Sequence, residues 1–203
     1  MTTRLAMGST HITDRSGGRS LAWFRGIGIA VLASAFVAVC AHVTLPLGFT
    51  PVPLTLQPFA VLLIGMVLSP RVAAGSLAAY LLEGAAGLPV FTPGTIALTG
   101  VAHLFGPTGG YLLAYPFAAF IIARLWNTST KTLVWAVIAT AAGNLLILAT
   151  GAVWMSVYTH GSMYAVLAQS VVPFLPGDAL KVLAAATLGF EWYRVRPARR
   201  SAE

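Results

Sequence analysis

The sequence predicts an all-α, polytopic membrane protein with six transmembrane helices and both termini in the cytoplasm. Hydrophobic residues make up 58% of the 203-residue chain and charged residues only 8%, a balance typical of membrane proteins. The hydrophobic residues fall in long runs, and most arginines flank the first and the last run. Despite the net charge of +7, this placement indicates contact with a lipid bilayer and not with nucleic acid.

Apolar runs give the order of the expected helices. They are Ile27–Leu45, Leu54–Leu68, Val72–Leu82, Gly110–Leu125, Leu133–Met155 and Ala179–Tyr193, with a further apolar piece at Tyr164–Val172. The second and third runs are short for a hydrocarbon core of ~30 Å, which takes about 20 helical residues. These two runs could therefore form a single helix through Ser69, Pro70 and Arg71.

Basic residues between the runs favour six spans over five. With six spans and a cytoplasmic N-terminus, Arg71, Arg124 and Lys131 all lie in cytoplasmic turns, as the positive-inside rule expects. With five spans, Arg71 would lie near the bilayer centre at a cost of ~3 kcal/mol or more. We therefore expect six spans.

The chain then divides into three parts. Residues 1–25 are polar and contain arginine, glycine and serine, so we expect a cytoplasmic tail of low order. Residues 26–193 form the six-helix membrane domain, and residues 194–203 form a basic cytoplasmic tail.

The first expected span has a small residue at every fourth position. Gly26, Ala30, Ser34 and Ala38 form a small-residue ridge that lets another helix approach closely. Packing within the bundle and docking of a partner membrane protein are both compatible with this ridge.

Two outer connections are apolar yet rich in helix breakers. The first contains Thr50–Gln57, with the sequence TPVPLTLQ, and the second contains Gly87–Phe91 and Gly106–Tyr111. Proline and glycine stop helices. Because irregular backbone at membrane depth persists only where it is buried in protein or lines a cavity, we expect one of these two environments.

The start of the last span carries an acid and a base in an otherwise apolar stretch. Pro176 suits a first helical turn, Asp178 complements the positive end of the helix dipole, and Lys181 shares a face with Asp178. The two residues could be a self-neutralising structural pair or, as intramembrane charges often are, a functional site. In the second case they suit a small molecule with both hydrogen-bond donors and acceptors.

Other polar residues lie near the same depth. Glu83 ends the third span at the outer side, and Asn144 lies within the fifth, where an interhelical hydrogen bond is its more common role. His103 and the other histidines have no helical ligand spacing and Cys40 is the only cysteine, so we expect no metal site. We also expect no cofactor, because the sequence has no phosphate loop or nucleotide fingerprint.

Four motifs in this order resemble those of the BioY family, the biotin-specific substrate-binding S components of energy-coupling factor transporters. They are Thr50–Gln57, Gly87–Phe91, Gly106–Leu112 and Phe174–Lys181. The resemblance spans about residues 27 to 190. It implies a six-helix S-component fold with a biotin pocket near the outer face, capped by the two outer connections.

The resemblance also implies roles for residues and partners. Asp178 and Lys181 are expected to hold the ureido end of biotin, and the small-residue ridge to dock a transmembrane coupling subunit. Two ATPase subunits would complete the transporter in the inner, cytoplasmic membrane. The other candidate substrate-binding residues are Glu83, Phe91, Tyr111, Gln57, Thr55 and Asn144.

One feature of some relatives is missing. They carry an arginine after the Pro-Val-Phe motif that can meet the biotin carboxylate, whereas residues 92–108 contain none. Backbone N–H groups, Thr92, Thr95 or Tyr111 could replace it, as could Lys181 if the ligand lies the other way round.

Three other functions remain open at this stage. The chain could be an S component for another small vitamin, or a purely structural membrane protein. It could also be a membrane enzyme that uses Asp178 and Glu83 as acid and base.

Overall fold

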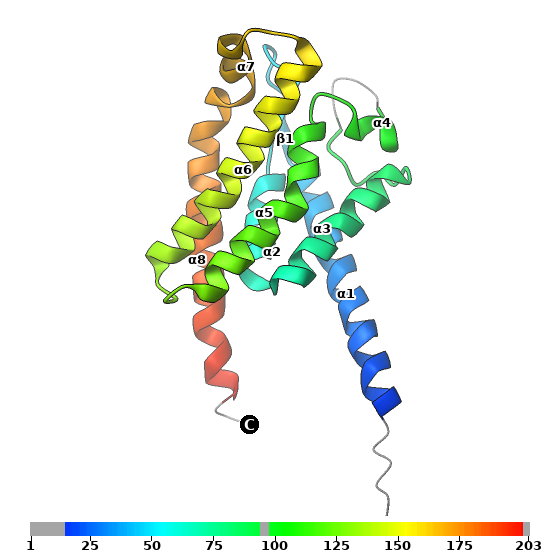
Figure 1. The fold of residues 1–203 in the computed structure, drawn as a ribbon, viewed down its shortest axis with the longest axis vertical. Helices are drawn as coiled ribbons and strands as arrows, with labels where there is room; N and C mark the ends of the chain where they lie inside the picture. Colours follow the sequence, from blue (N-terminus) through cyan, green and yellow to red (C-terminus); the bar gives the residue numbers. More distant parts are fainter. Residues whose placement is uncertain (1–14, 94–97, 201–203) are drawn as a thin grey trace, which may run out of the picture.

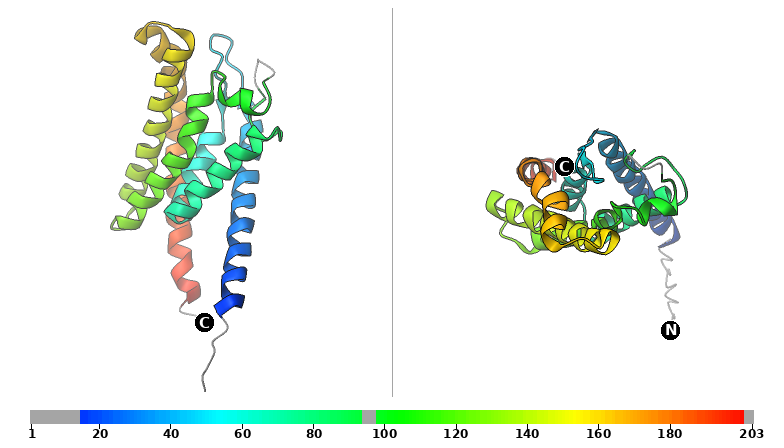
Figure 2. Two further views of the ribbon diagram at one scale, coloured as in Figure 1. Left: turned by 45° about the vertical axis from the view of Figure 1, so that its right-hand side comes forward. Right: turned by 90° about the horizontal axis from the view of Figure 1, so that it is seen from above.

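Long helices run side by side, and α1 and α8 extend beyond the others at one end (Figures 1 and 2). The computed structural model describes residues 15–93 and 98–200. Within them the helices are α1 (Arg15–His42), α2 (Gln57–Val67), α3 (Pro70–Ala85), α4 (Val101–Leu104), α5 (Gly109–Thr128), α6 (Leu133–Thr159), α7 (Met163–Ser170) and α8 (Leu175–Arg200), and Val172–Phe174 forms one 3₁₀ turn, η1. The predicted all-α class is confirmed.

Four segments of the described chain are long and apolar enough to cross a membrane. They are Phe24–His42, Gly109–Thr128, Leu133–Thr159 and Tyr164–Val195. Helix α2 is apolar but has 11 residues, and α3 has 16. The chain is therefore a multi-pass membrane protein by length and composition.

Helices α2 and α3 are separate, so the alternative of one continuous helix is excluded. Leu68 and Ser69 have extended backbone, and Pro70 begins α3, because proline fits a first helical turn but not a helix interior. Figure 1 shows α3 turning back toward the end of the bundle at which α2 begins.

Both terminal helices are longer than expected. Helix α1 begins at Arg15, so residues 15–25 are helical and not a tail of low order. Residues 15–25 contain no proline, and extending an existing helix adds a hydrogen bond for each residue fixed. Helix α8 likewise continues to Arg200, and the remaining tail residues, 1–14 and 201–203, lie outside the described residues.

Helix α5 occupies the centre of the bundle and packs against α2, α3 and α6. Its inward face is built from small residues and one isoleucine, and Ala118, Ala119 and Ile122 are fully buried. On α6, Gly143 lies directly against the Ile122 side chain. Small residues at such crossings let helices approach closely, which is how membrane bundles gain packing energy.

The end of the bundle opposite the chain termini holds α4, α7 and a two-stranded hairpin (Figure 1). Strands β1 (Thr44–Leu45) and β2 (Leu54–Thr55) pair antiparallel, with Thr44 opposite Thr55. The hairpin thereby fixes the connection between α1 and α2 above the start of α2. Thr55 of this hairpin lines a cavity in the bundle.

Candidate ligand-binding site

A cavity lies between the two irregular connections and the helices α2, α5, α6 and α8. About 530 Å³ of space free of protein atoms lies in and at the mouth of this cavity, open solvent included. By area, most of its wall is apolar. The polar side chains in the wall are those of Thr55, Gln57, Thr92, His103, Thr108, Tyr111, Tyr115, Asp178 and Lys181.

Asp178 and Lys181 form an ion pair on the α8 wall of this cavity. The distance from Lys181 Nζ to Asp178 Oδ1 is 2.9 Å, and only 4% of Asp178 and 9% of Lys181 are exposed. Asp178 lies in the first turn of α8, where a carboxylate interacts favourably with the positive helix end. The sequence predicted both the start of this helix near Pro176 and the position of Asp178 and Lys181 on one face of it.

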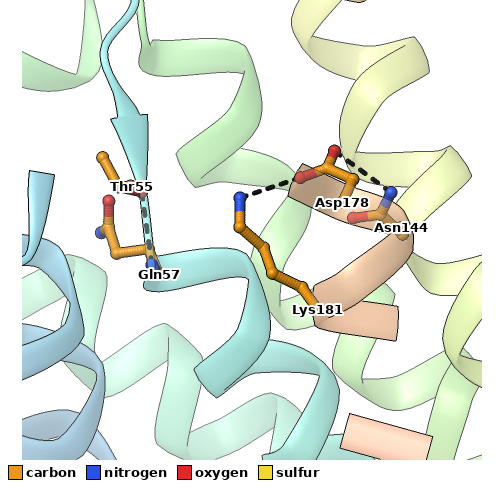
Figure 3. Close-up of polar contacts among 5 residues, drawn as sticks. All are labelled: Thr55, Gln57, Asn144, Asp178 and Lys181. Atoms are coloured by element: carbon orange, nitrogen blue, oxygen red, sulfur yellow. Dashed lines mark hydrogen bonds and ion pairs between the residues drawn. The ribbon is translucent and has the colours of Figure 1, made fainter. Parts of the chain in front are cut away.

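Asn144 supports the ion pair from α6. Its Nδ2 donates a hydrogen bond to Asp178 Oδ2 at 3.3 Å (Figure 3). Asn144 does not itself line the cavity, and its Oδ1 has no hydrogen-bond partner in the described part of the chain. The geometry therefore favours the interhelical hydrogen bond over direct ligand contact for this residue.

Gln57 ties the two irregular connections to α3. Its Nε2 donates to Tyr80 Oη at 2.6 Å, and its Oε1 accepts from Thr92 Oγ1 at 2.7 Å. Tyr80 Oη in turn donates to the Val90 carbonyl at 2.9 Å. Gln57 and Thr92 both line the cavity, but these bonds already occupy one donor and one acceptor of the Gln57 amide.

Thr55 lines the cavity at the start of the same segment. Its Oγ1 accepts a hydrogen bond from the Gln57 backbone N–H at 3.3 Å, a local turn that leads the chain into α2. Figure 3 shows Thr55 and Gln57 on the segment that Lys181 faces across the site.

Tyr111 contributes an aromatic wall from α5. Its Oη donates to the Ser170 carbonyl at 2.5 Å, and its ring lies edge-on to Phe174, with 6.4 Å between ring centroids. Tyr115, four residues further along, lies on the same helix face and also lines the cavity. Tyr111 thus joins α5 to the segment that precedes α8.

Glu83 and Phe91 are not brought to the cavity wall. The Glu83 carboxylate accepts a hydrogen bond from Ser34 Oγ on α1, and Glu83 is not among the described residues that line the cavity. Phe91 is buried behind the wall, where its ring packs against Tyr80 and His103 with centroid distances of 5.5 Å and 4.9 Å. The acid and base of the enzyme alternative therefore do not share one site.

Two positions of the small-residue ridge are used inside the bundle. Ser34 is buried and bonds to Glu83 of α3, and Ala38 packs against the hydrophobic core. Gly26 and Ala30 are partly exposed, and a Cβ atom added at Gly26 would meet no neighbour within 4 Å. Ser34 and Ala38 thus serve packing within the bundle, whereas Gly26 and Ala30 remain accessible on its surface.

The sequence interpretation missed His103, Tyr115 and Phe174 as wall residues. Tyr115 could have been found from its helical spacing to Tyr111. His103 was considered only as a metal ligand, although its place between two glycine- and proline-rich motifs was a usable signal. Thr95, one of the alternatives for carboxylate binding, lies outside the described residues.

The comparison with known families and sequences agrees with this geometry. The family model described as BioY family matches residues 11–198. The biotin transporter BioY2 of Lactococcus lactis is 35% identical over 167 residues, which cover 82% of this chain and 88% of the relative. The probable biotin transporter BioY of Pyrococcus horikoshii is 35% identical over 80% of this chain and 92% of its own. The biotin transporter BioY of Thermotoga maritima is 36% identical over 78% of this chain and 90% of its own.

A solved structure has the same fold. The crystal structure of the S-component for biotin from an ECF-type ABC transporter superposes with a TM-score of 0.75 and 26% sequence identity. The match covers 93% of this chain and 95% of that one. The similarity therefore extends over nearly the whole chain.

Proposed function

The chain belongs to the BioY family, and from this premise we propose that it takes up biotin as the substrate-binding S component of an energy-coupling factor transporter. The observation that carries the proposal is the buried Asp178–Lys181 pair in the wall of a mostly apolar cavity. The curated relatives named for biotin transport match this chain over most of both lengths.

The chemistry of biotin suits this cavity. The ureido ring offers two N–H donors and one carbonyl acceptor. The Asp178 carboxylate accepts hydrogen bonds and the Lys181 ammonium donates them, so together they satisfy both kinds of group at one end of the ligand. The sulfur-containing ring and the alkyl chain fit against aliphatic and aromatic side chains such as Leu148 and Phe174.

Six helices cross the membrane in this proposal: α1, α2, α3, α5, α6 and α8. The α2–α3 and α5–α6 turns lie at the same end of the bundle as the start of α1 and the end of α8 (Figure 1). Arg71, Arg124 and Lys131 are in or beside these turns. The positive-inside rule then assigns this end to the cytoplasm and the cavity to the outer side.

The chain works with other proteins in this proposal. A transmembrane coupling subunit and two ATPase subunits supply the energy in the inner membrane, and the chain itself performs no covalent chemistry and holds no resident cofactor. The partly exposed Gly26 and Ala30 leave the first half of the small-residue ridge open for the coupling subunit.

Uptake of radiolabelled biotin tests the proposal. A biotin-auxotrophic bacterium without its own biotin transporter is expected to accumulate biotin when it produces this chain together with the coupling and ATPase subunits. It should not do so when the chain carries Asp178→Asn and Lys181→Ala. Equal accumulation with and without the chain would reject the proposed function.

A further inference from the structure

Two side chains among the described residues of the cavity wall can carry a positive charge, Lys181 and His103. They come from opposite sides of the bundle, because Lys181 is on α8 and His103 is on α4 (Figure 1). A ligand that fills the cavity between them therefore meets one of them at each end.

The positive charge of Lys181 already has a counter-charge. Asp178 Oδ1 lies 2.9 Å from Lys181 Nζ, and both side chains are buried. A ligand carboxylate placed beside Lys181 would also lie beside the Asp178 carboxylate, and like charges at such distances repel strongly when water is excluded. The α8 end of the cavity is thus suited to a neutral group with donors and acceptors.

His103 has one ring nitrogen free for a ligand. It is 9% exposed, and its Nδ1 lies 3.2 Å from the Leu98 carbonyl oxygen. Because a carbonyl only accepts hydrogen bonds, Nδ1 carries a hydrogen, and Nε2 has no partner among the described residues. Stacking against Phe91, with 4.9 Å between ring centroids, holds the imidazole plane in place.

The neighbouring hydroxyl is already engaged. Thr92 Oγ1 donates its hydrogen to Gln57 Oε1 at 2.7 Å, so it has no hydrogen left for a ligand anion. Among the described residues of the cavity wall, His103 is the remaining side chain at this end that can supply a charged donor.

We propose that His103, as an imidazolium, donates its Nε2–H to the carboxylate of the bound vitamin and so determines that the ligand must carry a free acid. The inference rests on the proposed function and adds the end of the site at which the carboxylate binds.

Other titratable groups surround this position. Helices α3 and α5 pack against α4. Helix α3 carries Tyr80 and Glu83, and α5 carries Tyr111 and Tyr115. Helix α8 contributes Asp178 and Lys181 to the same cavity. His103→Gln leaves all of these groups in place. The change in the preference for biotin over its uncharged amide between the unmodified protein and His103→Gln therefore isolates the contribution of His103.

The test is equilibrium binding of biotin and of biotinamide to the detergent-purified full chain. We expect the unmodified protein to prefer biotin by about tenfold or more, since a charge-assisted hydrogen bond contributes that much. His103→Gln should remove most of this preference and change biotinamide binding little, and His103→Arg should retain it. His42→Gln is the matched control, because His42 is exposed and does not line the cavity.

An unchanged preference for biotin over biotinamide in His103→Gln would overturn the assignment of His103 alone. Failure of the unmodified protein to bind either ligand would overturn the proposed function together with it.

Discussion

Lys181 Nζ and Asp178 Oδ1 lie 2.9 Å apart on the first two turns of α8, and both side chains are buried in the wall of the cavity. A buried ion pair is no more stabilising than well-packed apolar side chains of similar size. Its presence in an apolar bundle is therefore explained better by a ligand that needs both a hydrogen-bond acceptor and a hydrogen-bond donor than by stability.

Breaking this pair should destabilise the fold more than removing it. Lys181→Met leaves Asp178 buried without its partner, which costs ~3–5 kcal/mol, whereas Asp178→Asn with Lys181→Met leaves no buried charge. We expect thermal unfolding, followed by tryptophan fluorescence in detergent, to occur at a lower temperature in the single variant than in the double variant.

The same helix offers a matched control for this prediction. Glu191 and Arg194 form an exposed pair with the same spacing and a distance of 3.1 Å. Exposed pairs contribute ~0–1 kcal/mol, so Arg194→Met should change the unfolding temperature little. If Lys181→Met and Arg194→Met lowered the unfolding temperature equally, the Asp178–Lys181 pair would not be a buried pair.

The hydrogen bonds around Gln57 should control how long the ligand stays bound. Thr92→Val removes the donor to Gln57 Oε1 and Tyr80→Phe removes the donor to the Val90 carbonyl. Each loss loosens the connection over the cavity, and we expect biotin to dissociate about tenfold faster, as the loss of one buried hydrogen bond predicts. Dissociation is measured by chase of bound labelled biotin.

A hydroxyl elsewhere serves as the control for these variants. Thr150 Oγ1 donates to the Leu146 carbonyl of its own helix at 2.7 Å and does not line the cavity. Thr150→Val should leave the dissociation rate unchanged. Equal rates in Thr92→Val, Tyr80→Phe and the unmodified chain would show that this network does not hold the ligand in place.

Close packing between α5 and α6 depends on Gly110. A Cβ atom there would lie 2.8 Å from the Thr150 carbonyl oxygen and would also overlap the Trp154 side chain. We expect Gly110→Ala to cost ~1–3 kcal/mol of stability and to lower the unfolding temperature. Gly75→Ala on α3 is the control, because a Cβ atom there meets nothing within 4 Å and alanine favours the helix. If Gly75→Ala lowered the unfolding temperature and Gly110→Ala did not, close packing at Gly110 would not matter for stability.

The proposed topology can be tested with single cysteines. Cys40→Ser removes the only cysteine, and Thr130→Cys or Gly161→Cys then places one exposed thiol in the α5–α6 turn or the α6–α7 turn. A membrane-impermeant maleimide added to intact cells should label only Gly161→Cys, and Thr130→Cys should react after permeabilisation. The reverse pattern would place the termini outside.

The sequence was sufficient for the features that depend on local chemistry. The apolar runs predicted the helical fold, and Pro176 with Asp178 predicted the start of α8, because helix-start preferences act within one turn. The separation of α2 from α3 at Pro70 follows from the same kind of rule. The irregular outer connections were expected to be buried or to line a cavity, and Thr55, Gln57 and Thr92 do line it.

Long-range contacts account for what the sequence did not reveal. Glu83 was expected either to join the site or to face water, but its carboxylate accepts a hydrogen bond from Ser34, which is 49 residues away in the chain. Phe91 was expected in the wall, but Gly84 leaves room for its ring behind the wall. His103 reaches the cavity because α4 packs against both α3 and α5, which spacing along one chain does not encode.

The first experiment to make is equilibrium binding of labelled biotin to the detergent-purified chain and to its variants Asp178→Asn, Lys181→Ala and Asn144→Ala. We expect the unmodified chain to bind biotin tightly and saturably, and the first two substitutions to abolish or greatly weaken this binding. Asn144→Ala should weaken it less, because Asn144 acts only through Asp178. No saturable binding by the folded, unmodified protein would rule out a biotin site, and equal affinity in all four proteins would show that the Asp178–Lys181 pair does not hold the ligand.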